Sequence, residues 1–257
     1  MGNDSLFGSD DDSIQSQDDV ASEQGSALAE QQLENGLATD DPNHVDMVVA
    51  SLEPPSIKGS YLLRDLIPLE IQELLMRRIL DERAITAQHP QAMLFPRSSM
   101  SGKDVDNCPE YLSDFVGNLP QLLRDYLSPE DLAIVFDERQ SLQTILNLYE
   151  PGQGITPHVD LPHRYAHPII GISLGSAVVM DFLPLNGGQA QAALLRPGDV
   201  YVLLHDARYQ YKHGIAYREV DLWRDEDGHV RQLYRGTRIS ITFRRMLSAV
   251  SELSVDA

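Results

Sequence analysis

The stretch that decides the fold is Asn147-Leu-Tyr-Glu-Pro-Gly-Gln-Gly-Ile-Thr-Pro-His-Val-Asp160, which ends with His158 and Asp160 two residues apart. In an extended backbone, residues i and i+2 project to the same side, so both of these side chains can reach one metal ion. A lone His-x-Asp pair occurs often by chance. The pair therefore predicts a metal site only if a third ligand lies elsewhere in the chain.

A third candidate ligand is His213, which lies in Tyr211-Lys-His-Gly-Ile215, 55 residues after His158. Two histidines and one carboxylate on one side of a metal leave the opposite positions open, which is typical of non-haem iron(II) oxygenases. The competing interpretation of His213 is a hydrogen-bonded structural histidine near a turn. We expect His158, Asp160 and His213 to form a catalytic metal site.

The segment Arg238-Ile-Ser-Ile-Thr-Phe-Arg244 alternates strictly between polar and apolar residues, which predicts a strand. In an ordinary sandwich its polar face would be solvated. Inside a half-open barrel the same face could bind an anion, because the fork of an arginine matches a carboxylate. Arg238 and Arg244 could serve the two ends of a small dicarboxylate. Asn147 and Tyr149 alternate in the same way and could donate hydrogen bonds to that dicarboxylate.

Residues 147–160 closely resemble the N-x-Y-x-x-G-x-x-I-x-x-H-x-D signature of the AlkB-like 2-oxoglutarate dioxygenases. The sequence also resembles later blocks of this family, and they occur in the same order. These blocks are Ser173-Leu-Gly-Ser176 with Met180-Asp-Phe182, then His213-Gly-Ile215, and then the arginine segment 238–244. The resemblance is strong over residues 140–247. It implies a mainly β fold with N-terminal helices (α+β), in the form of a double-stranded β-helix or jelly roll.

The resemblance also implies roles for the residues already singled out. The implied iron ligands are His158, Asp160 and His213, and the implied 2-oxoglutarate contacts are Asn147, Tyr149, Arg238 and Arg244. Fe(II), O2 and the cosubstrate 2-oxoglutarate would be the cofactors. The amino-acid sequences of these motifs look most like those of the family branch that acts on wobble uridines of transfer RNA.

We therefore expect an enzyme that hydroxylates or oxidatively demethylates modified bases in RNA, transfer RNA or DNA. The same chemistry on a protein substrate such as a histone is an alternative. A non-catalytic binding module on the same fold is another, although an intact triad and both arginines count against it. A zinc hydrolase using the same ligands would have no use for the arginine strand.

The charge of the chain bears on its partner. The net charge is −19, and residues 1–50 contain 12 acidic residues and no Lys or Arg, so 27 acidic residues face 20 basic ones over residues 51–257. This balance argues against broad phosphate binding and leaves a protein substrate open. A flipped or single-stranded base needs only a small local patch. We expect this patch to come from Arg164 and Tyr165 beside the metal motif, and from Arg208, Lys212 and neighbouring arginines around the cavity mouth.

Composition divides the chain into two parts. Residues 1–55, rich in Asp, Ser, Gln and Gly, are predicted to be a disordered acidic tail. Residues 56–257 would form the dioxygenase domain, with its core motifs in 140–247. The single cysteine, Cys108, fits a reducing compartment. No apolar run reaches the roughly 18 residues of a membrane span, so we expect a cytoplasmic or nuclear protein without a membrane partner.

Periodicity predicts the secondary structure of the domain. Helices are expected at about 69–83 and 110–126, the second interrupted by Pro120. Strands are expected at 144–149, 169–174, 177–182, 191–195, 199–204 and 237–244, and the charged segment 223–229 is expected to be a looped insertion.

Overall fold

The computed structural model describes residues 48–95, 107–137 and 140–247. Most of the predicted acidic tail, residues 1–47, lies outside the described residues. Its last part, residues 48–55, is described, and it packs on the domain. Ala50 is fully buried, and its backbone N–H donates to the carbonyl of Leu222 at 3.0 Å. The packed domain therefore begins before the predicted boundary at residue 55.

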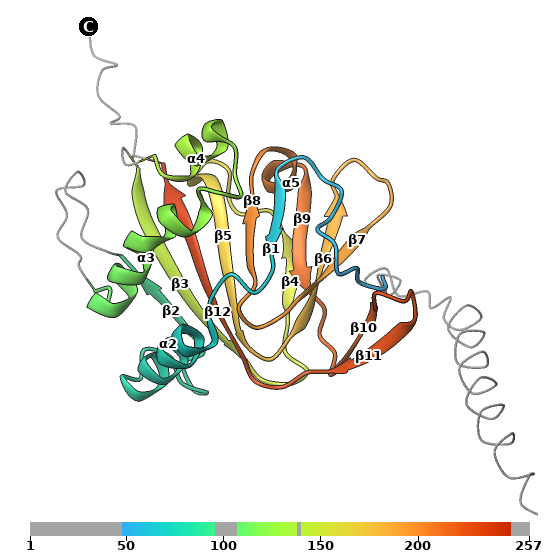
Figure 1. Ribbon diagram of the computed structural model, residues 1–257, viewed down its shortest axis with the longest axis horizontal. Helices are drawn as coiled ribbons and strands as arrows, with labels where there is room; N and C mark the ends of the chain where they lie inside the picture. The colour runs from blue at the N-terminus through green and yellow to red at the C-terminus, as the bar shows by residue number, and fades with distance from the viewer. Residues whose placement is uncertain (1–47, 96–106, 138–139, 248–257) are drawn as a thin grey trace, which may run out of the picture. The chain divides into compact units, whose positions relative to one another are not determined.

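The described residues form two antiparallel sheets and a separate hairpin (Figure 1). The larger sheet has the order β1-β8-β5-β12-β3-β2, with bounds Ser60–Leu63, Val200–Leu203, Tyr165–Gly175, Arg238–Met246, Ser141–Tyr149 and Gln91–Leu94. The smaller sheet has the order β4-β9-β6-β7, with bounds Ile155–His158, Tyr211–Ile215, Val178–Pro184 and Gln191–Leu195. The hairpin pairs β10 (Val220–Arg224) with β11 (Val230–Tyr234). The predicted mainly β jelly roll is confirmed.

Three helices cover the outer face of the larger sheet (Figure 1). They are α2 (Leu69–Asp81), α3 (Glu110–Leu123) and α4 (Pro129–Val135). The apolar half of β12, Ile239, Ile241 and Phe243, is buried in the same core cluster as these helices. Because side chains alternate along a strand, the polar half of β12 must face the interior between the two sheets.

Both predicted helices are present, but Pro120 does not interrupt the second one. It lies inside α3, which continues to Leu123. Leu119 and Leu123 on either side of it are buried in the core. Their packing offsets the hydrogen bond that proline cannot donate.

Each predicted strand is present, whereas several short strands escaped prediction. These are β1, β2, β4, β9, β10 and β11, and the helices α4 and α5 (His205–Tyr209) were not predicted either. The looped insertion predicted at 223–229 is the tip of a regular hairpin, since Trp223 pairs with Arg231 and Arg224 with Val230.

Buried charges anchor this hairpin to the smaller sheet. The fully buried Asp221 accepts two hydrogen bonds from Arg235, at 2.6 and 2.7 Å, and one from Arg218 at 2.7 Å. It also accepts from the backbone N–H of Val179 on β6 at 2.9 Å. Asp181 also lies on β6, but among the described residues its carboxyl lacks a comparable set of hydrogen-bond donors. Burial raises the pKa of this carboxyl to about 6.

Replacing Asp181 by Asn is expected to stabilise the protein at pH 8. The pKa of Asp181 is higher in the folded protein than in the unfolded chain, so folding favours the protonated carboxyl. Above pH 6 the carboxyl is ionised in both states, and its burial then lowers the stability of the folded protein. This cost disappears as the pH falls towards the ordinary value of 3.8. We expect a gain of about 1–3 kcal/mol at pH 8 and almost none at pH 4, measured by urea unfolding. Asp221→Asn should instead destabilise by about 3–5 kcal/mol, because it leaves the buried Arg235 and the partly buried Arg218 without their carboxylate. Equal effects of Asp181→Asn at both pH values would contradict the assignment.

Candidate metal and cosubstrate site

The pairing of two strands in the smaller sheet brings the predicted metal ligands together. His158 on β4 lies opposite His213 on β9, and their ring centroids are 4.6 Å apart. Potential ligand atoms of these histidines and of Asp160 all lie within 4.8 Å of one another. The strands can approach this closely because residue 214 is glycine. A Cβ there would lie 2.8 Å from the backbone of Pro157.

Hydrogen bonds orient two of the three side chains. Nδ1 of His158 lies 2.9 Å from the carbonyl oxygen of Thr156, and its Nε2 lies 3.3 Å from Oδ1 of Asp160. Donation of the Nδ1 proton to a carbonyl leaves Nε2 as the free ligand nitrogen, as is usual in metal sites. Nδ1 of His213 is buried without a hydrogen-bond partner among the described residues.

The electrostatics of the triad favour an ionised Asp160 beside a neutral His213, whereas the hydrogen bond with Asp160 raises the pKa of His158. Burial opposes ionisation of Asp160, but the hydrogen bond from His158 and the charge of Arg244 outweigh it and hold its pKa well below the usual range. Burial, together with the charge of His158, lowers the pKa of His213 to about 4. The carboxylate and neutral His213 are the forms that bind a divalent cation.

Arg238 is the most unusual side chain of the site. It is buried on the inner face of β12, and its Nε donates to Oγ of Ser173 at 3.0 Å. Its two terminal nitrogens have no hydrogen-bond partner among the described residues. Burial lowers the pKa of this guanidinium. A buried charge with donors left over is strongly unfavourable unless an anion completes it.

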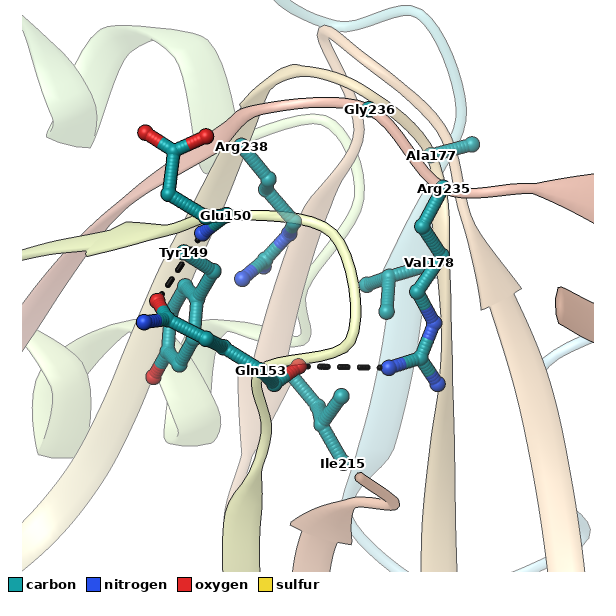
Figure 2. Close-up of a pocket in the computed structure, with 9 residues that line it drawn as sticks. All are labelled: Tyr149, Glu150, Gln153, Ala177, Val178, Ile215, Arg235, Gly236 and Arg238. Atoms are coloured by element: carbon teal, nitrogen blue, oxygen red, sulfur yellow. Dashed lines mark hydrogen bonds between the residues drawn. The ribbon is translucent and has the colours of Figure 1, made fainter. Parts of the chain in front are cut away.

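The neighbours of Arg238 add further polar groups. Its guanidinium lies 5.5 Å from the ring centroid of Tyr149, and Figure 2 shows the two side chains next to each other under the turn that carries Gln153. Arg235 holds this turn from its other side, donating to the carbonyls of Gln153 and Ala216 at 3.3 and 2.7 Å. The oxygen of the Asn147 carboxamide accepts from Gln91 at 2.7 Å, so this side chain offers N–H donors to a ligand.

Arg244, the fourth predicted cosubstrate contact, forms an ion pair with the predicted metal ligand Asp160. Its Nη1 lies 3.1 Å from Oδ2 of Asp160, and its Nε donates to Gln143 at 2.9 Å. Its guanidinium stacks on Tyr165 at 3.9 Å from the ring centroid. Arg244 therefore links the larger sheet to the metal ligands.

All of the predicted site residues line one cavity of about 250 Å³. Its lining includes His158, Asp160, His213, Asn147, Tyr149, Arg238, Ser240, Thr242 and Arg244. Sequence reasoning missed other lining residues, among them Gln91, Met93, Met180 and Tyr201. Met180 lies in a block that carries the family resemblance, but that block assigned it no role, and the other three lie on short strands that carry no motif. Only the alternation of Tyr201 with buried valines on β8 could have indicated that it faces inward.

The predicted basic patch is wrong for three of its four named residues. Arg208 has 0% of its surface exposed and donates to the carbonyls of Asp160 and Tyr165 at 2.9 and 3.0 Å. Tyr165 is buried beneath Arg244. Lys212 is exposed, but it precedes the inward-facing His213 on β9 and so projects from the opposite face of the sheet. Only Arg164 remains exposed beside the metal ligands.

Within residues 48–95, 107–137 and 140–247, no helix has both the length and the apolar character required to cross a membrane.

Comparison with known proteins is consistent with this geometry. Residues 64–244 match the family described as the 2OG-Fe(II) oxygenase superfamily. An uncharacterized protein, L905, of Acanthamoeba polyphaga mimivirus is 35% identical over 132 residues, covering 50% of this chain and 59% of that protein.

Two named relatives also match. One is tRNA (carboxymethyluridine(34)-5-O)-methyltransferase alkbh8 of Xenopus tropicalis, 34% identical over 115 residues, with 40% of this chain and 18% of that protein covered. The other is the mitochondrial alpha-ketoglutarate-dependent dioxygenase alkB homolog 7 of Bos taurus, 34% identical over 119 residues, with coverages of 44% and 51%. The chain thus spans less than two thirds of the length of each of these relatives. With the family model covering most of the domain, the chain belongs to the 2OG-Fe(II) oxygenase superfamily and, within it, to the AlkB-like dioxygenases.

Proposed function

We propose that this protein is an Fe(II)- and 2-oxoglutarate-dependent dioxygenase that hydroxylates or oxidatively demethylates a modified base in RNA, transfer RNA or DNA. The observation that carries the proposal is a single cavity that combines two features. One is the cluster of His158, Asp160 and His213, and the other is the buried, incompletely partnered guanidinium of Arg238.

The donor set fits iron. His158 and His213 would each supply a ring nitrogen and Asp160 one carboxylate oxygen, which is the facial set that leaves coordination positions open. Thr156 fixes the orientation of the His158 ring through its carbonyl. Arg244 holds the second oxygen of Asp160 at 3.1 Å, which keeps the carboxylate directed at the cluster.

The polar face of β12 fits the cosubstrate. The two free donors of Arg238 match one carboxylate of 2-oxoglutarate in a charge-assisted pair. Tyr149 and Asn147 would add neutral hydrogen bonds, and Arg244 would complete the contacts near the metal. When bound, iron would activate O2: one oxygen atom of O2 would enter succinate as 2-oxoglutarate is oxidised and loses CO2, and the other would convert a C–H bond of the substrate into C–OH. An N-methyl group treated in this way is lost as formaldehyde.

The choice of a nucleic-acid base rests on the relatives, one of which is named for its action on a transfer RNA uridine. A protein substrate is the second candidate. It is favoured by the acidic balance of residues 51–257 and by the burial of Arg208 and Tyr165, which removes two of the four named residues of the predicted basic patch.

The first prediction concerns the metal. His213→Ala should weaken Mn(II) or Fe(II) binding by ~100-fold or more, because loss of an outer-shell partner alone costs about 10–100-fold. Binding is measured by anaerobic titration calorimetry, and circular dichroism checks that the variant is folded. His163→Ala, in the exposed loop just beyond Asp160, is the matched control and should bind metal normally. Tight metal binding by the His213 variant would refute the ligand assignment.

The second prediction concerns Arg238. Arg238→Met should raise the dissociation constant of 2-oxoglutarate by ~100-fold or more, because a carboxylate loses its charge-assisted pair. The same change should leave metal affinity intact and stabilise the ligand-free protein by about 1–3 kcal/mol, because it removes a buried, incompletely partnered charge. Arg231→Met, on the exposed part of the hairpin, should change neither. Unaltered 2-oxoglutarate affinity in Arg238→Met would show that β12 does not bind the cosubstrate.

The third prediction concerns the substrate. Enzyme supplied with iron and 2-oxoglutarate should release succinate with a methylated single-stranded oligonucleotide or transfer RNA, and this turnover should fall as salt rises. Arg164→Glu should lower turnover several-fold, whereas Lys212→Glu, on the opposite face of the sheet, should not. Succinate release with histone peptides alone would favour the protein substrate. No turnover with any of them, despite bound iron and 2-oxoglutarate, would favour a non-catalytic module.

A further inference from the structure

A cluster of titratable side chains joins the helices α4 and α5, and its members are not among the residues that line the cavity. Asp131 of α4 accepts a hydrogen bond from the phenol of Tyr61 and another, at 2.8 Å, from Nε2 of His205, the first residue of α5. Burial opposes ionisation of Asp131, but these two hydrogen bonds outweigh it and lower the pKa of its carboxyl. The carboxylate therefore holds the two helices together through His205.

His205 has a backbone conformation that few residues other than glycine adopt. Its φ is +47°, in the left-handed region, where a residue with a Cβ is strained. Such strain persists only where the surrounding contacts impose it. Here the contacts are the hydrogen bond to Asp131 and the backbone hydrogen bond from Ala207 to the carbonyl of Lys58 at 3.1 Å. The position of α5 therefore depends on the Asp131–His205 pair.

Helix α5 also carries Arg208, whose side chain extends to the metal site. Arg208 is fully buried and donates to the backbone carbonyls of Asp160 and Tyr165 at 2.9 and 3.0 Å. Its guanidinium lies 4.7 Å from the ring centroid of Tyr209. The helix has only 5 residues, so a shift of its first residue must also move Arg208. His205 is thus coupled to the backbone of Asp160 through a single turn of helix.

His167 of β5 is the second histidine of the cluster. Its ring centroid lies 5.4 Å from that of His205 and 4.6 Å from that of Tyr209, and its Nδ1 is buried without a hydrogen-bond partner among the described residues. The charged and titratable groups that face it are His205, Arg208 and Tyr209 of α5 and Asp131 of α4, with Tyr165 two residues before it on β5. Burial, followed by the charges of His205 and Arg208, lowers the pKa of His167, so its ring is neutral at neutral pH.

We propose that Asp131, His205 and His167 form an acid-sensitive positioning device for the metal ligand Asp160. While His167 is neutral, the Asp131–His205 pair keeps α5 in place, and Arg208 holds the carbonyl of Asp160. A proton on His167 adds a cation beside His205 and Arg208, and the repulsion loosens α5 and its hold on Asp160. The three residues contact neither metal nor substrate and act only by positioning. The inference rests on the proposed function, because it assumes that Asp160 binds the metal.

Falling pH should act against this device. The ordinary pKa of a histidine is 6.5, and that of His167 is lower in the folded protein. The intact packing thus excludes a proton that the loosened or unfolded chain binds, so its stability is complete above pH 6.5 and is lost as the pH falls below it. Metal binding also requires neutral His158 and His213, so metal affinity falls at low pH in every variant. The device adds a further fall, which should disappear when residue 167 cannot be protonated.

The test compares the Mn(II) affinity of the full chain at pH 7.5 and pH 5.5 by titration calorimetry. His167→Gln keeps a polar side chain and takes up no proton in this range. It should bind Mn(II) like the wild type at pH 7.5 and ~10-fold more tightly than the wild type at pH 5.5, the factor that corresponds to about one pH unit of proton coupling. In an Arg208→Met background, His167→Gln should no longer change the pH dependence, because the connection to Asp160 is missing.

Two further measurements address the other parts of the device. His205→Asn tolerates a positive φ, but its shorter side chain does not reach Asp131, so it should weaken Mn(II) binding several-fold at both pH values. In urea unfolding of the metal-free chain, the wild type should lose more stability between pH 7.5 and pH 5.5 than His167→Gln does. Circular dichroism checks that each variant is folded.

His163→Gln, in the exposed loop after Asp160, is the matched control and should follow the wild type at both pH values. Identical pH profiles of the wild type and His167→Gln would overturn the inference. So would Mn(II) binding by His167→Gln that is weakened equally at the two pH values, which is the mark of a merely structural residue. A difference in unfolding without one in Mn(II) affinity would show that the proton has no effect at Asp160, and would also overturn it. All three results leave the proposed function standing, whereas failure of the wild type to bind Mn(II) at pH 7.5 would overturn both.

Discussion

The structure depends on a central strand that carries a charged face inside the protein. Strand β12 lies between β3 and β5, with an apolar side packed under the helices and a polar side in the cavity. Burying the guanidinium of Arg238 costs free energy that no described protein group fully compensates. The rest of the fold tolerates this cost because the helices bury the other side of the strand. An anionic ligand would recover it, so ligand binding and domain stability are coupled through this strand.

A second coupling joins the two sheets. The metal cluster belongs to the smaller sheet and the cosubstrate face to the larger one, and Arg244 spans the distance by binding Asp160. Arg208 lies on α5, the short helix that precedes β9, and donates hydrogen bonds to the backbone carbonyls of Asp160 and Tyr165. One arginine thus fixes the carboxylate and the other fixes its backbone. Asp160 is held from both sides before any metal arrives, which lowers the reorganisation needed for binding.

Sequence reasoning succeeded where a strong periodic signal coincided with a chemical one. The alternation of residues 238–244 predicted a strand with two unlike faces, and the 147–160 motif predicted ligands that the fold does bring together. It failed where long-range packing decides the outcome. Arg208 looks like a surface arginine in the sequence, and only the tertiary structure supplies the two carbonyls that bury it. The hairpin at 220–234 carries many charged residues, and it becomes ordered because Asp221 receives donors from three separate segments.

The corrected position of the basic residues narrows the way in which a substrate can be recognised. With Arg208 and Tyr165 buried and Lys212 on the opposite face, the exposed groups that the structure describes near the predicted metal ligands are the loop 161–164 and the edge strand β2 with Gln91 and Met93. Among the described residues, these groups amount to one arginine and a few neutral side chains, which cannot by themselves hold a long stretch of phosphates, because such binding requires many basic contacts. They can hold one flat group inserted into the cavity, since stacking and edge hydrogen bonds act on a single base. Selectivity would then come from the shape of the cavity mouth, and the acidic charge of the domain would be no obstacle to it.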